Sequence, residues 1–220
     1  SPWIGDPADP TDMANAQKVR LAMSMAVDRQ SIIDVLLGGR GCPSYLFTTD
    51  ACSPFFQDKW KIPFDIDGAK ALLTEAGFPS GFEFTFFIPT GLDTTREEIG
   101  LALVPMWEAI GLDVTVEKAA YSARRPTMLD RTISDAWIFG HVDAQLRESY
   151  VSMMDFFTTR RVWNPGYEYD RAREFEDELK VLVQQDEADA VIENWLQWIS
   201  DLTPDIQIAS YKVPWAVGPG

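Results

Sequence analysis

The sequence predicts an α/β protein with a mixed, partly parallel sheet flanked by helices. Its 220 residues are 46% hydrophobic and 24% charged, the balance of a globular chain that buries a core. Residues 82–88 and 112–116 alternate between apolar and polar side chains, as strands do. Apolar residues at helical spacing fill the stretch between them. A strand, a helix and a second strand in this order indicate a βαβ unit with parallel strands.

The N-terminal third is predicted to be mainly helical. Residues 13–37 form a helix, because small and apolar side chains recur every three or four positions, and Asp28 can cap a second turn of it. Residues 39–64 show little periodicity and are expected to form a long loop. Asp67 is expected to begin a short helix over residues 69–76.

The βαβ unit and the elements after it are bounded by turn and capping signals. The first strand is expected to end at Pro89-Thr90-Gly91, and Thr94-Thr95-Arg96-Glu97 is expected to open the next helix as a capping box. Gly111 ends that helix. The elements expected after the unit are a strand at 135–139, helices at 170–185 and 187–200, and a strand at 206–211.

The charge balance excludes one class of partner. The chain has 19 Lys and Arg against 34 Asp and Glu, a formal net charge of -15. Such a surface repels the phosphate backbone of nucleic acid, so we expect no nucleic-acid partner. Its apolar runs are shorter than the roughly 18 residues that a membrane-spanning helix requires.

The cysteines and the single histidine limit the metal chemistry. Cys42 and Cys52 lie in one loop rich in Pro, Ser and Thr, and one His cannot complete an ordinary four-ligand zinc site with them. We therefore predict no metal site. The two cysteines form either a loop disulfide or two free thiols, and the disulfide, which we expect, would fit an oxidising compartment. Motifs for binding nucleotides are absent, and no cofactor is predicted.

Three blocks of the sequence resemble one known family. Residues 18–32 are similar to the helix motif V-R-x-A-x-x-x-A-x-D-R-x-x-I, residues 64–78 to Y-D-P-x-K-A-K-x-L-L-x-E-A-G-Y, and residues 107–114 to L-x-x-I-G-I-x-V. These motifs are those of extracellular solute-binding proteins of family 5, the peptide/nickel-type receptors of ABC importers. Each block alone could be an ordinary amphipathic helix, but the three agree in order and spacing.

The resemblance implies a lobe like those of periplasmic binding proteins of type II, cluster C. Members of the family enclose a ligand between two lobes, and the three blocks belong to the second. Residues 1–220 are therefore expected to be one C-terminal ligand-binding lobe, with 1–12 and 212–220 as crossover segments to a missing N-terminal lobe. A periplasmic or extracellular location is implied, and a lipid anchor in the full-length protein is left open.

The resemblance also implies a function without catalysis. The chain is expected to be part of the solute-binding component of an ABC importer, which captures an oligopeptide or a similar small solute in an interlobe cleft. The membrane permease of the transporter is the implied partner to which the solute is delivered. The isolated lobe is expected to bind weakly or not at all, since affinity in such receptors comes from closure of two lobes.

Candidate ligand contacts lie where the parallel strands end, because ligands of open α/β sheets bind beyond the carboxyl ends of strands. These are Thr90 after the first strand, and His141 and Asp143 after the third. In peptide-binding members that third segment resembles G-W-x-x-D-x-x-D-P, and its Asp receives the ligand's α-amino group. Here Asp143 lies one position early and the Asp-Pro pair is missing. His141 could equally be an exposed histidine, and Asp143 a turn cap.

Aromatic residues add further candidate contacts. Trp137 and Phe139 alternate with Ile138, so one face of this strand is core and the other can reach the cleft. Tyr45, in the loop with the cysteines, and Tyr121, after a strand, complete the set of candidates.

Three alternatives to the peptide receptor stay open. The eight Trp residues keep an oligosaccharide-binding receptor of the same family in consideration, since aromatic faces pack against sugar rings. A carboxylate-based hydrolase would use Asp143 with another acid, and an interaction lobe would bind no solute. Nickel is disfavoured, because the chain has one His.

Overall fold

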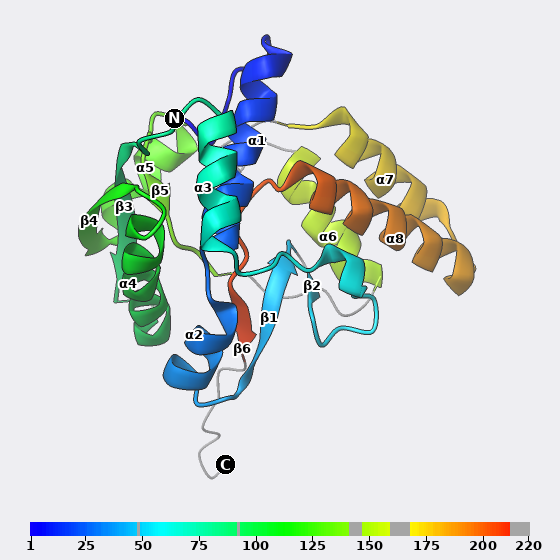
Figure 1. Cartoon of the computed structure of the whole chain (residues 1–220). Helices are drawn as coiled ribbons and strands as arrows, with labels where there is room; N and C mark the ends of the chain where they lie inside the picture. The colour runs from blue at the N-terminus through cyan, green and yellow to red at the C-terminus, as the bar shows by residue number, and fades with distance from the viewer. Residues whose placement is uncertain (48, 92, 141–146, 159–167, 212–220) are drawn as a thin grey trace.

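The computed structural model describes residues 1–47, 49–91, 93–140, 147–158 and 168–211. Within them the fold is mixed α/β, as predicted, and helices surround a parallel and an antiparallel sheet (Figure 1). The elements are α1 (Pro10–Met25), α2 (Arg29–Leu36), β1 (Gly41–Leu46), β2 (Thr49–Asp50), η1 (Asp58–Trp60), α3 (Ile66–Glu75), β3 (Glu83–Thr90), α4 (Thr94–Glu108), β4 (Asp113–Ala120), α5 (Tyr121–Leu129), β5 (Ala136–Trp137), α6 (Arg147–Thr158), α7 (Asp170–Val181), α8 (Gln185–Leu202) and β6 (Ala209–Tyr211).

The parallel sheet has the order β4-β3-β5. β3 pairs in parallel with β4 along its full length, and with β5 on its other edge. This confirms the predicted βαβ unit, because α4 connects β3 to β4 and packs on both strands. The central strand buries both faces: Phe86 joins the core that includes α1 and α4, whereas Phe87 packs with Met128 of α5. Burial on both faces is typical of a parallel strand.

The antiparallel sheet has the order β2-β1-β6 and joins distant parts of the chain, since Cys42 of β1 pairs with Ser210 of β6. The expectation of a loop over residues 39–64 is therefore wrong for β1, β2 and η1, which lie within it. The residues of β1, Gly-Cys-Pro-Ser-Tyr-Leu, have a mixed strand propensity. Pairing with β6 supplies the hydrogen bonds that stabilise the strand. This pairing is not visible in the local sequence pattern of β1.

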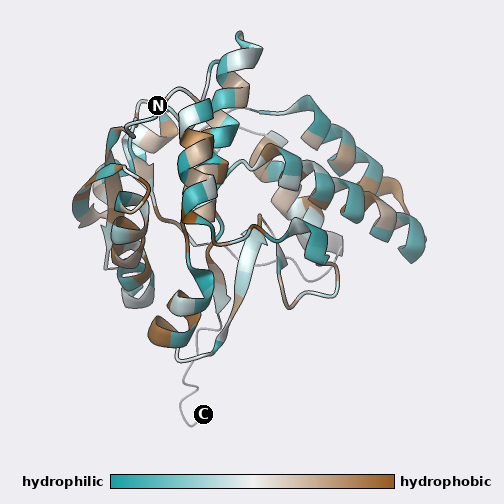
Figure 2. Ribbon diagram, in the orientation of Figure 1, coloured by the Kyte–Doolittle hydropathy of each residue, from teal (hydrophilic) through white to brown (hydrophobic). Residues whose placement is uncertain are grey.

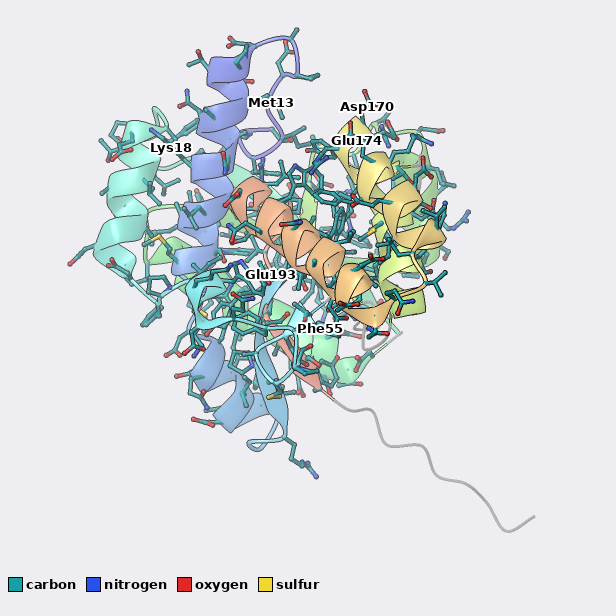
Figure 3. The ribbon with its side chains drawn as sticks, turned by 90° about the vertical axis from the view of Figure 1, so that its right-hand side faces the viewer. Met13, Lys18, Phe55, Asp170, Glu174 and Glu193 are labelled. Atoms are coloured by element: carbon teal, nitrogen blue, oxygen red, sulfur yellow. A yellow bond between two sulfur atoms is a disulfide. The ribbon has the colours of Figure 1, made fainter. Side chains whose placement is uncertain are left out.

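Helices α6, α7 and α8 pack around a second hydrophobic core, separate from that of the parallel sheet. Its largest fully buried side chains are Trp60, Tyr150 and Trp195. Hydrophilic residues dominate the outer sides of α7 and α8 (Figure 2). Glu193 is on the face that Figure 3 turns to the viewer, and its carboxylate pairs with Lys59 at 3.3 Å. The amphipathic hairpin α7–α8 thus covers the second core.

Several predicted boundaries need correction. The predicted helices 170–185 and 187–200 correspond to α7 and α8, with the break several residues earlier, and the predicted strand 206–211 is confined to β6. Helices α5 and α6 were not predicted from the sequence. Helix α5 contains two Arg and a Pro, which weaken its apolar pattern. Helix α1 begins at Pro10, so the end of the expected crossover segment 1–12 is helical. Among the described residues, no helix is long and apolar enough to cross a bilayer.

The predicted helix 13–37 is two helices in the structure. Asp28 is the N-cap of α2, and its carboxylate accepts a hydrogen bond from the backbone N–H of Ser31 at 3.0 Å. Asp65, rather than Asp67, caps α3, because its carboxylate accepts from the backbone N–H of Gly68 at 2.9 Å. In both helices the carboxylate satisfies a donor that the first turn leaves unpaired.

The predicted capping box at the start of α4 is also wrong. Asp93 is the N-cap, and its carboxylate accepts from the backbone N–H of Thr95 at 3.0 Å. Glu97 reaches back to the backbone N–H of Gly91 at 3.1 Å and pairs with Lys118 on β4 at 3.2 Å. Because the capping residue comes one position earlier than predicted, Arg96 takes the place of the box's acidic partner.

Candidate functional site

A cavity of about 650 Å³ lies between the two sheets. The first turn of α4 and the residues of β5 and just after it line one side, and the segment 204–211, which includes β6, lines the other. Side chains of α6 also contribute. This volume is within the roughly 300–1,000 Å³ of sites for small organic ligands. The cavity adjoins the carboxyl end of β5 and the first turn of α4, the helix that follows β3. Ligands of α/β sheets bind beyond the carboxyl ends of strands.

Aromatic rings form part of the cavity wall. Trp137 and Phe139, two of the predicted contacts, line it from β5 and the residues just after it. Trp3 lines it from the N-terminal segment, with its ring centroid 5.2 Å from that of Phe84. Trp107 lines it from α4 but is only 3% exposed, so it belongs to the core as well. Apolar ring faces of this kind can pack against the apolar parts of a solute.

Two arginines of the described chain line the cavity, and they differ in their partners. The guanidinium of Arg20 donates to three backbone carbonyls, those of Thr203 at 2.5 Å, Trp3 at 2.6 Å and Leu202 at 3.0 Å. Burial lowers the pKa of Arg20, and the carbonyls compensate its lost hydration. Arg96 instead forms a long ion pair with Asp93, with 3.9 Å between Nη2 and Oδ2. Arg96 is therefore the better placed of the two to bind a solute.

Asp93 is held by two hydrogen bonds. Its Oδ1 accepts from the backbone N–H of Thr95, and its Oδ2 accepts from the hydroxyl of Tyr211, at the end of β6, at 2.5 Å. Burial first, then this hydrogen bond and the charge of Asp93, raise the pKa of Tyr211, while the charge of Arg96 and a hydrogen bond from its guanidinium to the Tyr211 hydroxyl partly offset the rise. Tyr211 is therefore protonated at neutral pH, and its hydroxyl donates a hydrogen bond to Asp93.

The side chain of Arg96 lies against Gly140, directly after β5. A Cβ on Gly140 would lie 2.7 Å from Nη2 of Arg96 and 3.1 Å from its Cζ and Nε. The Cζ atom of Arg96 is 5.8 Å from the centroid of the Phe139 ring. A side chain at position 140 would thus displace the guanidinium from its place beside this ring.

The predicted contacts fall into three groups. Trp137 and Phe139 line the cavity. His141 and Asp143 lie outside the described residues. The residues named as lining the cavity do not include Thr90, Tyr45 or Tyr121, which the structure describes elsewhere.

Each of these last three residues has its own structural surroundings. Thr90 is the last residue of β3 and pairs with β4. The guanidinium of Arg29 lies over the ring of Tyr45, with its Cζ atom 4.8 Å from the ring centroid. Tyr121 packs with Met128 on the face of β3 opposite the main core. Their positions give a structural account of each residue without a solute.

Arg96, Asp93 and Tyr211 have no predicted binding role in the sequence. One signal could have found Arg96, because it is in the first helical turn after the carboxyl end of a parallel strand, the same place that indicates Thr90. Tyr211 offers no such signal. Its contact with Asp93 spans 118 residues and depends on where the antiparallel sheet lies.

Cys42 and Cys52 are joined in a disulfide. The carboxylate of Asp50 lies near them, and the ligand atoms of the three residues are all within 4.8 Å of one another. Because the two sulfurs are bonded to each other, this group has no thiolate to offer a metal ion. The disulfide instead links β1 to the turn after β2.

Comparisons with known proteins agree with the fold. Residues 9–211 match the model of the bacterial extracellular solute-binding proteins, family 5 middle. Protein XP55 of Streptomyces lividans is 30% identical over 57% of this chain and 25% of its own length. The oligopeptide-binding protein AppA of Bacillus subtilis is 29% identical over 49% of this chain and 22% of its own length.

The structural likeness extends over more of the chain. The periplasmic binding protein DppA of Helicobacter pylori, solved in complex with the peptide STSA, has a TM-score of 0.73 and 21% identity. The likeness covers 94% of this chain and 40% of that one, and it confirms a fold of the periplasmic-binding-protein type. The matched part of this chain spans about a quarter or less of the length of Protein XP55 and of AppA. With the family model matched over almost all of its described residues, the chain belongs to the bacterial extracellular solute-binding proteins of family 5.

Proposed function

We propose that this chain is the ligand-binding lobe of a solute receptor that serves an ABC importer. The lobe captures a peptide or a similar small solute, and a membrane permease receives it. The observation that carries the proposal is the cavity of about 650 Å³ at the carboxyl end of β5 and the first turn of α4. Aromatic residues line it together with two arginines, of which Arg96 is the better placed to bind a solute, and a peptide offers both apolar side chains and a carboxylate.

The names of the relatives support this class of solute. AppA is named an oligopeptide-binding protein, and the DppA structure contains a peptide. The chain carries the matched region of the family, and we infer that residues 1–220 form one C-terminal lobe with a partner lobe elsewhere in a longer polypeptide. The solute would be enclosed when the two lobes close about a hinge, which removes it from water.

The predicted contacts complete this site. Trp137 of β5 and Phe139, just after it, would pack against the solute, and we propose His141 and Asp143, which follow in the sequence, as further polar contacts. We keep Thr90, Tyr45 and Tyr121 as contacts that only the closed, two-lobed receptor could bring to the solute. The receptor would act in the periplasm or outside the cell, with or without a lipid anchor, and without catalysis.

Calorimetric titration tests the proposal. This chain and a longer polypeptide with both lobes are titrated with short peptides, the same peptides as C-terminal amides, and oligosaccharides. We expect the longer polypeptide to bind peptides and this chain to bind them weakly or not at all. Micromolar or tighter binding by this chain alone would contradict the two-lobe part. Recovery of a cleaved peptide after the titration would favour the hydrolase alternative.

A matched pair of variants locates the site. Arg96→Gln removes the lining cation that is better placed to bind a solute, whereas Arg40→Gln removes an exposed cation outside the cavity. We expect the first change to weaken binding of free peptides by about tenfold, the size of one charge-assisted hydrogen bond, and the second to leave it unchanged. Equal effects of the two would show that the solute binds elsewhere.

The aromatic wall favours an oligosaccharide as the second candidate. Trp3, Trp137 and Phe139 line the cavity, and aromatic rings can pack against the apolar faces of sugars. A neutral sugar would not depend on Arg96. Binding of an oligosaccharide that Arg96→Gln leaves unchanged, together with no binding of peptides, would select this candidate.

A further inference from the structure

We propose that the hydroxyl of Tyr211 keeps Arg96 available for an anionic solute by holding the carboxylate of Asp93. Tyr211 is then a positioning residue, because it acts on the solute through two other side chains. The inference rests on the proposed function, in that it assumes a solute in the cavity. It adds a chemical class, a carboxylate, and a residue that sets the strength with which the carboxylate binds.

The geometry that carries this inference centres on one oxygen atom. Oδ2 of Asp93 accepts the hydrogen bond from the Tyr211 hydroxyl at 2.5 Å. The same oxygen is 3.9 Å from Nη2 of Arg96, beyond the range of a hydrogen bond. Asp93 and Arg96 are three positions apart at the start of α4, where side chains of opposite charge are neighbours. Without the Tyr211 hydroxyl, Oδ2 of Asp93 loses a hydrogen-bond donor. The guanidinium of Arg96 is close enough to replace that donor by a small movement.

The consequence for a solute follows from the donors of the guanidinium. An arginine has five N–H donors in a plane, which match the two oxygens of a carboxylate. A close pair with Asp93 would use these donors and cancel the charge. The side chain of Arg96 is 19% exposed, and Gly140 and the ring of Phe139 border it, so it has little room to serve two carboxylates. The carboxylates of Asp93 and the solute would therefore compete for Arg96.

The positions of these residues link the cavity to both sheets. Arg96 and Asp93 belong to the start of α4, which packs on the parallel sheet. Tyr211 ends β6, whose place is set by its pairing with β1 in the antiparallel sheet. The hydrogen bond between Tyr211 and Asp93 forms only when the two sheets are aligned as they are here. Alignment of the sheets thus determines whether Arg96 can receive a carboxylate.

Three variants and two probes test the inference. The variants are Tyr211→Phe, Asp93→Asn, which retains a capping side chain, and the double variant. The probes are 3-phenylpropionate and its uncharged amide, titrated against 15N-labelled chain and followed by NMR. We expect Tyr211→Phe to weaken binding of the carboxylate by about tenfold and to leave binding of the amide unchanged. The double variant should bind the carboxylate as Asp93→Asn does, because no carboxylate is left to sequester Arg96.

A measurement without any ligand separates this inference from the proposed function. In Tyr211→Phe, exchange of the Arg96 Nε–Hε proton with water should slow as the close ion pair forms, and in the double variant it should not. Unchanged exchange in Tyr211→Phe, equal weakening of both probes, or a double variant as weak as Tyr211→Phe would overturn the inference. If the unaltered chain binds neither probe, that result agrees with the weak binding expected of a single lobe, and the exchange measurement alone decides whether Tyr211 holds Asp93 away from Arg96. The proposed function is tested separately, by titration of the two-lobed polypeptide.

Discussion

The Nε atom of Arg29 donates a hydrogen bond to the carbonyl oxygen of Gln207 at 2.9 Å, across 178 positions of the chain. The same atom donates to the carbonyl of Ser44 at 2.8 Å, and the Nη atoms donate to the hydroxyl and carbonyl of Ser24 at 2.7 and 3.0 Å. Arg29 is only 3% exposed, and this burial lowers its pKa to about 10. One buried cation therefore joins the end of α1, β1 and the segment that leads into β6.

Replacement of this cation should destabilise the fold. We expect Arg29→Lys to lower the free energy of unfolding by roughly 2–4 kcal/mol, because an ammonium group cannot reach acceptors in three parts of the structure and leaves buried carbonyls unpaired. Urea unfolding followed by circular dichroism measures the change. Arg40→Lys, at an exposed arginine, is the matched control and should stay within about 0.5 kcal/mol of the unaltered protein. A similar small effect at Arg29 would contradict the prediction.

The disulfide should stabilise the region around β1 and β2. Cys42 and Cys52 are 10 positions apart, and closure of a loop of this length stabilises a fold by roughly 2–3 kcal/mol, mainly through the entropy of the unfolded chain. We expect a thiol reductant to lower the midpoint of unfolding in guanidinium chloride. The variant Cys42→Ser/Cys52→Ser should unfold at that lower midpoint with or without the reductant. The prediction fails if the reductant shifts the two proteins equally.

The parallel sheet could be predicted because its signals are local. The alternation in β3 and β4 and the helical spacing in α4 each occur within one element, and the order of the three determines the parallel pairing. The cores on the two faces of β3 follow from the same alternation, with Phe86 on one face and Phe87 on the other. Strand β1 was missed for the opposite reason, since its partner β6 comes from the far end of the described chain.

The cavity could be predicted only where it follows the strand ends. Trp137 and Phe139 were identified because both fall in the predicted strand 135–139, and the structure places β5 and the residues just after it in the cavity wall. Arg96 was predicted to be an inner position of a capping box. In the structure Asp93 caps the helix, and the side chain of Arg96 lines the cavity. Tyr211 reaches the cavity through the pairing of β6 with β1. The part of the site that depends on contacts between the two sheets could therefore not be predicted from the periodicity of the sequence.

The cap of α2 should give the stability a pH dependence. The hydroxyl of Ser31, at 2.6 Å, and then its backbone N–H, at 3.0 Å, lower the pKa of Asp28 below its ordinary value of 3.8. Since the folded pKa is below the unfolded one, the carboxylate stabilises the fold above the ordinary pKa, and this contribution is lost as the pH falls through the lowered value. At neutral pH, Asp28→Ala should lower the free energy of unfolding by about 1 kcal/mol.

The matched variant for the pH dependence is Asp28→Asn, which can cap the helix without ionising. Urea unfolding at a series of pH values from neutral to about 2.5 gives the difference in stability between this variant and the unaltered protein. We expect that difference to change in favour of the variant as the pH falls below the ordinary pKa of Asp28. A difference that stays constant over the whole series would show that the ionised form of Asp28 has no special place in the cap.

Two tryptophans that line the cavity should respond differently to substitution. The indole N–H of Trp107 donates a hydrogen bond to the backbone carbonyl of Met23 at 3.1 Å. The ring centroids of Trp107 and Phe86 are 4.9 Å apart. Met23 is near the end of α1, where carbonyls lack partners within the helix. Trp107→Phe should therefore lower the free energy of unfolding by roughly 2–3 kcal/mol, through an unpaired buried carbonyl and a gap in the core.

Trp137 is the matched control, because it lines the same cavity but is only half-buried. Trp137→Phe should cost less than about 1 kcal/mol of unfolding free energy, since the ring is only half-buried and phenylalanine keeps most of its apolar contact. In the two-lobed polypeptide, Trp137→Ala should weaken solute binding by more than Trp107→Phe does, because Trp137 offers its ring to the cavity. Urea unfolding and calorimetric titration of the same variants measure both quantities. If Trp107→Phe proved the less destabilising of the two phenylalanine variants, the indole of Trp107 would have no part in closing the end of α1, and the cavity wall rather than the core would be its role.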